Sequence, residues 1–216
     1  MSEYTIVKHG APTLAGIKTG NLITCAFRTK EEVQQDLRRW NRMLTRKHLR
    51  IIPLKYMDGK VLLYIYRPSS LRKDLKDPVV REILRSCGYE AFSEADCIGT
   101  LMRRLRDSEE FPHEIGVFIG YPPEDVNGFI RNRGRNYKYS DCWKIYGDVD
   151  SSVRLIRKYR HCTEVYERLG KNGRTMELGR TEKVGPKKKA RARFARSKFE
   201  ISTEQILVID FCSEVS

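Results

Sequence analysis

The sequence has no apolar run that approaches the roughly 20 residues of a membrane-spanning helix. Its first residues, Met1 to Thr5, lack the basic start and apolar stretch of a secretory signal. No segment is repeated along the chain. These absences predict a cytoplasmic protein with no membrane partner.

Cysteine pairs at metal-binding spacing are also lacking. The six cysteines are scattered and form no CxxC motif, so neither a zinc site nor a redox-active dithiol is indicated. His113-Glu114 does not begin an HExxH motif, because Val117 occupies the position of the second histidine. We therefore expect free thiols, no disulfide and no bound metal.

Acidic residues are few relative to basic ones. The 42 Lys and Arg exceed the 28 Asp and Glu, which gives a net charge of +14 over 216 residues. Residues 170–199 carry a net charge of +9, residues 200–216 carry −4, and residues 1–169 carry the remaining +9. This balance favours anionic partners, without choosing among nucleotides, nucleic acids and acidic proteins.

The N-terminal region is predicted to form a helix, a strand and a second helix. Pro12 suits a first helical position and predicts a short helix over residues 12–18, which an apolar strand over 22–27 follows. A capping box that begins at Thr29 precedes apolar residues at helical spacing. This pattern predicts an amphipathic helix over 30–47.

Two β-rich runs, 50–57 and 60–67, are joined by Asp58-Gly59. This dipeptide is typical of a tight hairpin turn. The second run is apolar on both faces, which predicts a strand in the interior of a sheet. The apolar run 115–119 predicts another buried strand.

The remaining elements complete an α/β pattern. They are predicted helices from Asp77 to Gly88, from Ser93 through Leu105, after Pro122-Pro123 and over about 150–169, and a strand over 142–146. The fold class is therefore α/β, with a mixed sheet of about five strands and helices packed on it. A single domain is expected over 1–169.

Residues 170–216 are predicted to form a basic extension of low order. Glycines interrupt any regular element, and the run from Lys187 to Arg193 is too charged to bury a face. Residues 206–211 are apolar and fit either a last strand or an unpaired segment.

Three sequence blocks resemble a known family. They are His9 to Lys18 with Gly20-Asn21-Leu22, Phe111 to Gly116 with Gly120 to Val126, and Cys142 to Gly147 with Tyr159 and Cys162. Together they are similar, over about residues 5–168, to the bacterial family labelled domain of unknown function 3793. The resemblance implies no established activity. An association of such genes with flavodoxin and iron-transport genes implies a redox or metal-housekeeping link. The extension after residue 169 departs from the family's usual ending.

An anion site is predicted from the first two blocks. His9 at a predicted helix N-terminus, with Lys18 and Asn21 one to two turns away, suits a phosphate or carboxylate. The alternative is a packed helix in which His9 bonds a neighbour. This site predicts a cytosolic accessory or binding protein for an anionic small ligand.

Further ligand contacts are expected where strands end. Tyr121 follows Gly120 at the end of a predicted strand, where ligands gather in open α/β sheets. Arg67 ends another strand, and His113 precedes the buried run. The alternative for the Gly120 turn is a rigid connection that needs glycine and proline only for geometry.

Two other functions compete with ligand binding. One is non-specific nucleic-acid binding through Lys187 to Arg193, although only Phe194 and Phe199 are available there for base stacking. The other is an enzyme of unknown reaction that uses His113, Glu114 or Cys142. Cys142, Cys162 and His161 suggest either a redox pair or shared metal, or buried thiols. No cofactor is indicated.

Overall fold

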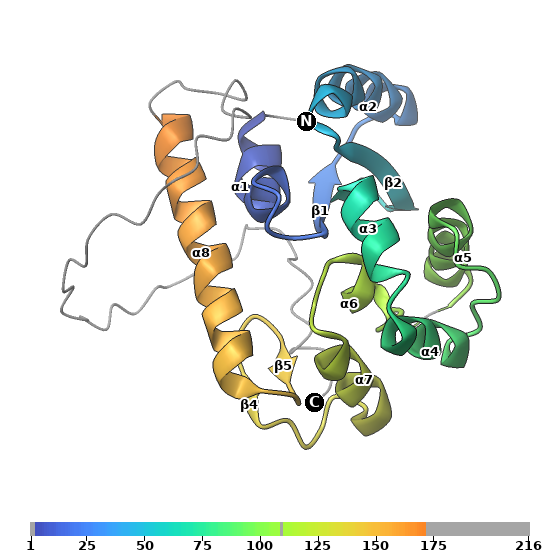
Figure 1. Cartoon of the computed structure of the whole chain (residues 1–216). Helices are drawn as coiled ribbons and strands as arrows, with labels where there is room; N and C mark the ends of the chain where they lie inside the picture. The colour runs from blue at the N-terminus through green and yellow to red at the C-terminus, as the bar shows by residue number, and fades with distance from the viewer. Residues whose placement is uncertain (1–2, 109, 172–216) are drawn as a thin grey trace, which may run out of the picture.

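The computed structural model describes residues 3–108 and 110–171 (Figure 1). The basic run 187–193 and the apolar segment 206–211 lie outside the described residues. Helices surround two small antiparallel sheets, so the predicted mixture of helix and strand is confirmed. In the described part of the chain, every helix is too short or too polar to span a membrane.

The larger sheet contains β1 (Gly20–Ala26), β2 (Arg50–Met57) and β3 (Lys60–Tyr66) in the order β1-β3-β2. The hairpin prediction is confirmed, because Met57 pairs with Lys60 across the turn and Gly59 adopts a φ of 62°. Positive φ is the conformation that this turn requires. β3 is central and buried beyond Lys60, as its continuous apolar run predicted.

The sheet prediction is wrong in size and in direction. Three antiparallel strands form one sheet, and β4 (Tyr139–Ser140) and β5 (Lys144–Ile145) form a separate pair. The predicted strand over 115–119 is instead α6 (Ile115–Phe118), a single helical turn that is buried on all sides. A short apolar run buried all round has no periodicity that separates strand from helix.

The N-terminal helix begins earlier than predicted. α1 spans Glu3–Leu14, contains Pro12, and is followed by Gly16 at a φ of 75°. The predicted helix over 12–18 is therefore wrong, and residues 15–19 form the turn that leads to β1. Proline disfavours a helical conformation of the residues before it, which is why Pro12 indicated a helix start, but α1 accommodates it in its last turn.

The remaining helices lie close to their predicted positions, with one addition. Thr29 caps α2 by accepting a hydrogen bond from the Glu32 N–H at 3.1 Å. Only the short α3 had no sequence-based prediction. The elements are α2 (Lys30–Leu44), the 3-10 helix η1 (Thr45–Lys47), α3 (Pro68–Asp74), α4 (Pro78–Ser86), α5 (Glu94–Asp107), α7 (Pro123–Asn132) and α8 (Val149–Lys171).

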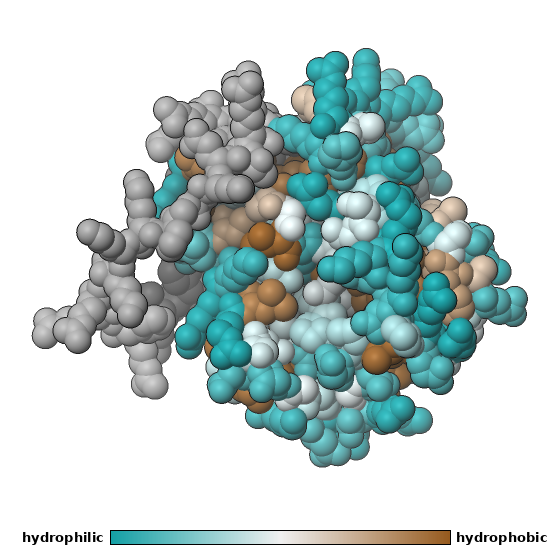
Figure 2. Space-filling view, in the orientation of Figure 1, coloured by the Kyte–Doolittle hydropathy of each residue, from teal (hydrophilic) through white to brown (hydrophobic). Residues whose placement is uncertain are grey.

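The three-stranded sheet separates two hydrophobic layers (Figure 1). On β3, alternate residues from Val61 to Ile65 pack with the buried stripe of α2 and with α1. The intervening residues from Leu62 to Tyr66 pack with α3 to α7. Figure 2 shows hydrophilic residues over α2 and hydrophobic residues in small separate patches on that face.

Asp125 in the first turn of α7 organises the C-terminal part of the domain. The residue is 2% exposed, and its carboxylate accepts hydrogen bonds from Trp143 Nε1 (2.8 Å), Tyr146 N (2.8 Å), Gly147 N (2.8 Å) and Ser152 Oγ (3.0 Å). The donors flank β5 or belong to α8. One buried carboxylate therefore joins these segments to α7.

We expect Asp125→Asn to lower the free energy of unfolding by about 2–3 kcal/mol, because an amide nitrogen replaces an acceptor oxygen and the negative charge is lost. Urea denaturation monitored by circular dichroism measures the change. Glu124→Gln is the matched control, since Glu124 is the exposed neighbour, and a change within about 0.5 kcal/mol is expected. Equal losses in both variants would contradict the role of Asp125.

Candidate functional site

His9 lies in the middle of α1 and not at a helix N-terminus, so the predicted anion site at a helix end is wrong. Its Nε2 is buried and has no hydrogen-bond partner among the described residues. Burial and the nearby Lys8 lower the pKa of His9, whereas Glu167 of α8 raises it. α1 and α8 pack side by side (Figure 1), which places His9 within a helix–helix contact.

Arg67 and Asn21 are engaged in local structure. The Arg67 guanidinium donates to the backbone carbonyls of Thr13 (2.9 Å), Leu14 (2.7 Å) and Lys47 (3.2 Å). It therefore satisfies carbonyls at the ends of α1 and η1, which helix termini leave unpaired. Asn21 Oδ1 accepts a hydrogen bond from Thr13 Oγ1 at 2.8 Å. These bonds use three of the five N–H donors of Arg67, so its expected role as a clamp on an external anion stays a prediction.

The structure places Lys18 beside Tyr121. Lys18 Nζ lies 5.1 Å from the ring centroid of Tyr121 and 5.5 Å from that of Tyr159 on α8. Tyr121 in turn stacks on Trp143, with ring centroids 4.5 Å apart. These distances are those of cation–π contacts, in which the ring faces attract the ammonium.

The aromatic surroundings leave the Lys18 ammonium poorly hydrated. Burial lowers the pKa of Lys18 to about 8, and the nearby Cys142 raises it slightly. Within residues 3–108 and 110–171, no carboxylate forms an ion pair with Lys18. A lysine in such surroundings is a functional candidate, although aromatic contacts also explain its place.

His113 and Tyr121 line the same cavity, whose volume is about 10 Å³. That space holds at most one water molecule and excludes a small organic ligand. The His113 ring packs against Phe129 with centroids 4.8 Å apart. Tyr121 is therefore packed among its neighbours, and the cavity that it shares with His113 is too small for a ligand.

The proposed catalytic groups have structural partners. Glu114 is 1% exposed, forms an ion pair with Arg104, and accepts a hydrogen bond from the Tyr89 hydroxyl at 3.2 Å. Burial and Glu114 raise the pKa of Tyr89. Burial likewise raises the pKa of Cys142, which disfavours the reactive thiolate.

The described cysteines and potential ligands form no metal site. Cys25, Cys87, Cys97, Cys142 and Cys162 are free thiols. Among the residues that the structure describes, no group of three or more His, Cys, Asp or Glu side chains is arranged to hold a metal ion. Cys212 lies outside the described residues.

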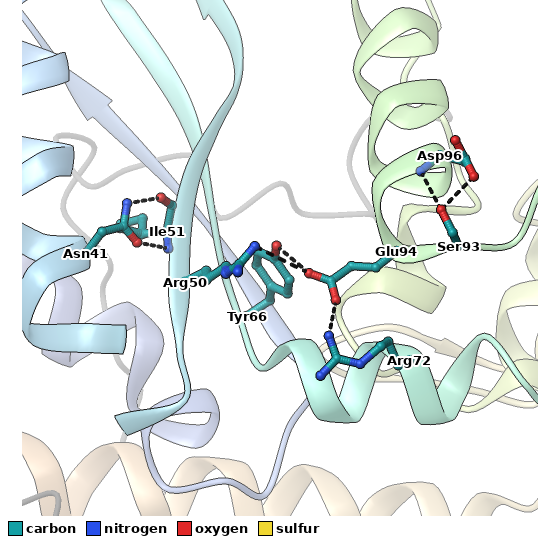
Figure 3. Close-up of polar contacts among 8 residues, drawn as sticks. All are labelled: Asn41, Arg50, Ile51, Tyr66, Arg72, Ser93, Glu94 and Asp96. Atoms are coloured by element: carbon teal, nitrogen blue, oxygen red, sulfur yellow. Dashed lines mark hydrogen bonds and ion pairs between the residues drawn. The ribbon is translucent and has the colours of Figure 1, made fainter. Parts of the chain in front are cut away.

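Glu94 forms a second polar cluster, between the sheet and the helices that cover it (Figure 3). Its carboxylate accepts hydrogen bonds from the Tyr66 hydroxyl (3.0 Å) and Arg72 Nη1 (2.5 Å), and Arg50 lies 4.0 Å away. Burial and Glu94 raise the pKa of Tyr66 to about 12. Charges of both signs meet here, so the cluster holds β2, β3, α3 and α5 together.

The groove between α2 and β2, called here the α2–β2 groove, has a volume of about 810 Å³ and opens to solvent. Three arginines lie on it at intervals of four residues, two on α2 and one on η1. Its lining is Leu37, Arg38, Asn41, Arg42, Thr45, Arg46, Ile51, Ile52 and Pro53. Drug-sized ligands occupy sites of about 300–1,000 Å³, so this groove is large enough for a ligand.

The arginines of the groove lack acidic partners. No carboxylate in the described part of the chain forms an ion pair with Arg38, Arg42 or Arg46. Arg42 Nε donates only to the backbone carbonyl of Arg38, at 3.4 Å. All three side chains are exposed. The groove is therefore bordered by uncompensated positive charge.

The outer edge of β2, which borders the groove, has backbone groups that already form hydrogen bonds. Asn41 Nδ2 donates to the Ile51 carbonyl at 2.8 Å, and the Ile51 N–H donates to Asn41 Oδ1 at 3.0 Å (Figure 3). Pro53, two residues later, has no N–H, and the register shifts between Pro53 and Lys55. These features protect the outer edge of the sheet from pairing with another strand.

The chain belongs to the family described as protein of unknown function DUF3793, which matches residues 6–178. The matched range holds the groove, the Lys18 contacts and the Asp125 hydrogen bonds. The resemblance found in the three sequence blocks is thereby confirmed. No curated protein and no solved structure matches the chain.

Lys18→Met should stabilise the protein at pH 7 and lose this advantage at alkaline pH. Below pH 8 the native wild type carries the full cost of a poorly hydrated ammonium. Between the native pKa of about 8 and the ordinary value of 10.5, the native state releases its proton first, so wild-type stability rises relative to the variant. Urea denaturation from pH 7 to 10 measures the difference, and a constant difference would contradict this account.

Proposed function

We propose that this protein binds an anionic ligand in the α2–β2 groove and acts as an accessory binding protein. The observation that carries the proposal is the stripe of Arg38, Arg42 and Arg46 along a groove of about 810 Å³, without an acidic partner among the described residues. Such a stripe attracts an anion and offers planar donors to carboxylates or phosphates.

Several other arginines of the domain, unlike those of the groove, form ion pairs within the chain. Arg72 pairs with Glu94, Arg104 with Glu114, and Arg160 with Asp141. In each case the arginine neutralises a carboxylate of the same chain. The groove arginines have no such ion pair among the described residues, which is also true of Arg131, Arg135 and Arg157. What distinguishes the groove arginines is their place along one groove, where their donors are available to an external anion.

The lining of the groove favours binding over catalysis. Among the described residues that line it, none is a histidine, cysteine, lysine, aspartate or glutamate, and Thr45 alone carries a hydroxyl. General acid–base catalysis needs a group that titrates near the working pH, and none lines this groove. The groove can therefore hold and orient an anion, while a reaction would need groups from elsewhere.

The test compares two triple variants of the full chain that lose the same charge. The groove variant is R38A/R42A/R46A, and the surface variant is R131A/R135A/R157A, three exposed arginines outside the groove. The probes are a fluorescein-labelled polyglutamate peptide and a fluorescein-labelled oligothymidylate, each of about 15 units. Fluorescence anisotropy gives the dissociation constants.

We expect the groove variant to bind at least one of these polyanions about tenfold more weakly than wild type, since three partly exposed contacts are each worth about 0.5–1 kcal/mol. The surface variant should stay within about twofold of wild type, because it retains the stripe. Equal losses in both variants would show attraction to net charge alone and contradict the groove as the site.

A further inference from the structure

The groove combines its basic rim with an apolar floor. Leu37 and Ile51 are buried, Pro53 remains half-buried where the groove opens, and the half-buried Ile52 packs against the layer on the other face of the sheet. The floor is aliphatic, and no aromatic ring lies among the lining residues. Nucleic-acid grooves rely on aromatic rings that stack with bases, so the lining suits apolar side chains better than bases.

From this lining we infer that the α2–β2 groove docks an acidic amphipathic helix of a partner protein, which rests on the proposed function and specifies its ligand. The helix places its apolar side chains on the floor. Its carboxylates meet the arginines of the rim. This is the helix-in-groove mode, in which residues at spacings of three and four anchor one face.

The spacing of the rim fits a helical partner. Arg38 and Arg42 lie four residues apart on α2, so they are about 6 Å apart along the helix axis, and Arg46 follows four residues later on η1. Acidic residues at intervals of four on a facing helix repeat at the same distance. Each guanidinium then meets one carboxylate.

The edge of β2 argues against an extended partner. A peptide that added a strand would need the backbone groups of Ile51, which the Asn41 amide already occupies. Pro53 has no N–H to donate, and the register shift after it bends the strand away from regular pairing. A helix satisfies its own backbone and needs none of these groups.

The direct test uses the full chain and labelled peptides of about 18 residues, a length at which a helix can form. One peptide carries leucines along one helical face and glutamates on both sides of them. Its control is a scrambled peptide of the same composition, which has the same charge and no apolar face. Fluorescence anisotropy compares both peptides with the oligothymidylate probe.

We expect the amphipathic peptide to bind at least tenfold more tightly than the scrambled peptide and the oligothymidylate, because only it presents both acidic and apolar contacts. The groove variant should lose about tenfold of this affinity, whereas the surface variant should keep it within about twofold. This outcome supports the proposal.

Pro53→Thr separates the contribution of the apolar floor from that of the arginine rim, because Pro53 lies at the open edge of the floor, whereas Ile52 packs on the other face of the sheet. Threonine suits a strand but places a hydroxyl at the groove. The variant should bind the amphipathic peptide about fivefold more weakly and leave binding of polyglutamate unchanged, provided that its thermal midpoint matches wild type. Pro53→Ser, with a smaller side chain, replaces it if Pro53→Thr lowers that midpoint.

Three results would overturn the inference. Equal binding of the amphipathic and scrambled peptides, or tighter binding of oligothymidylate through the same arginines, would leave the proposed anion site intact and exclude the helix. Tighter binding of a peptide with the sequence of residues 200–216, which holds four acidic residues and no Lys or Arg, would assign the groove to the chain's own end. If no probe depended on the groove arginines, the proposed function itself would fail.

Discussion

The buried carboxylate of Asp125 fixes how the C-terminal part of the domain meets the rest. Its four acceptor contacts run to Trp143, to the backbone after β5 and to Ser152 at the start of α8. Trp143 stacks on Tyr121, and α8 carries Tyr159, so the two rings that contact Lys18 depend on this one acceptor. A buried carboxylate needs such donors, because its desolvation is otherwise too costly.

Some basic side chains stabilise the fold through internal partners, whereas others form no ion pair among the described residues and can contact an external anion. Glu94 and Glu114 neutralise arginines that hold helices to the sheet, and Arg67 satisfies carbonyls at helix ends. Lys18 contacts two aromatic rings and forms no ion pair within residues 3–108 and 110–171. In the same part of the chain, the arginines of the α2–β2 groove form neither an ion pair nor a cation–π contact, which is why the proposed function is placed there and not at the Tyr121 turn.

Sequence patterns correctly predicted the elements that depend on a few neighbouring residues. The capping box at Thr29 and the Asp58-Gly59 turn formed as expected, because each depends on a few neighbouring residues. The strand predicted over 115–119 failed, since a short run buried on every side has no periodicity to read. The helix predicted to begin at Pro12 was wrong because proline favours a helix start but is tolerated inside a helix when packing stabilises it, as in the last turn of α1.

Sequence patterns alone identified the family, the mixture of helices and strands, and the basic character of the chain. They also contained the four-residue spacing of Arg38, Arg42 and Arg46, which lie on α2 and η1. Which cations remain uncompensated depends on the folded structure, because a carboxylate partner can come from any part of the chain. The groove and the hydrogen-bonded edge of β2 could not be predicted from the sequence either. Asn41 and Ile51 come from different elements, and the packing of α2 on β2 sets the space between them.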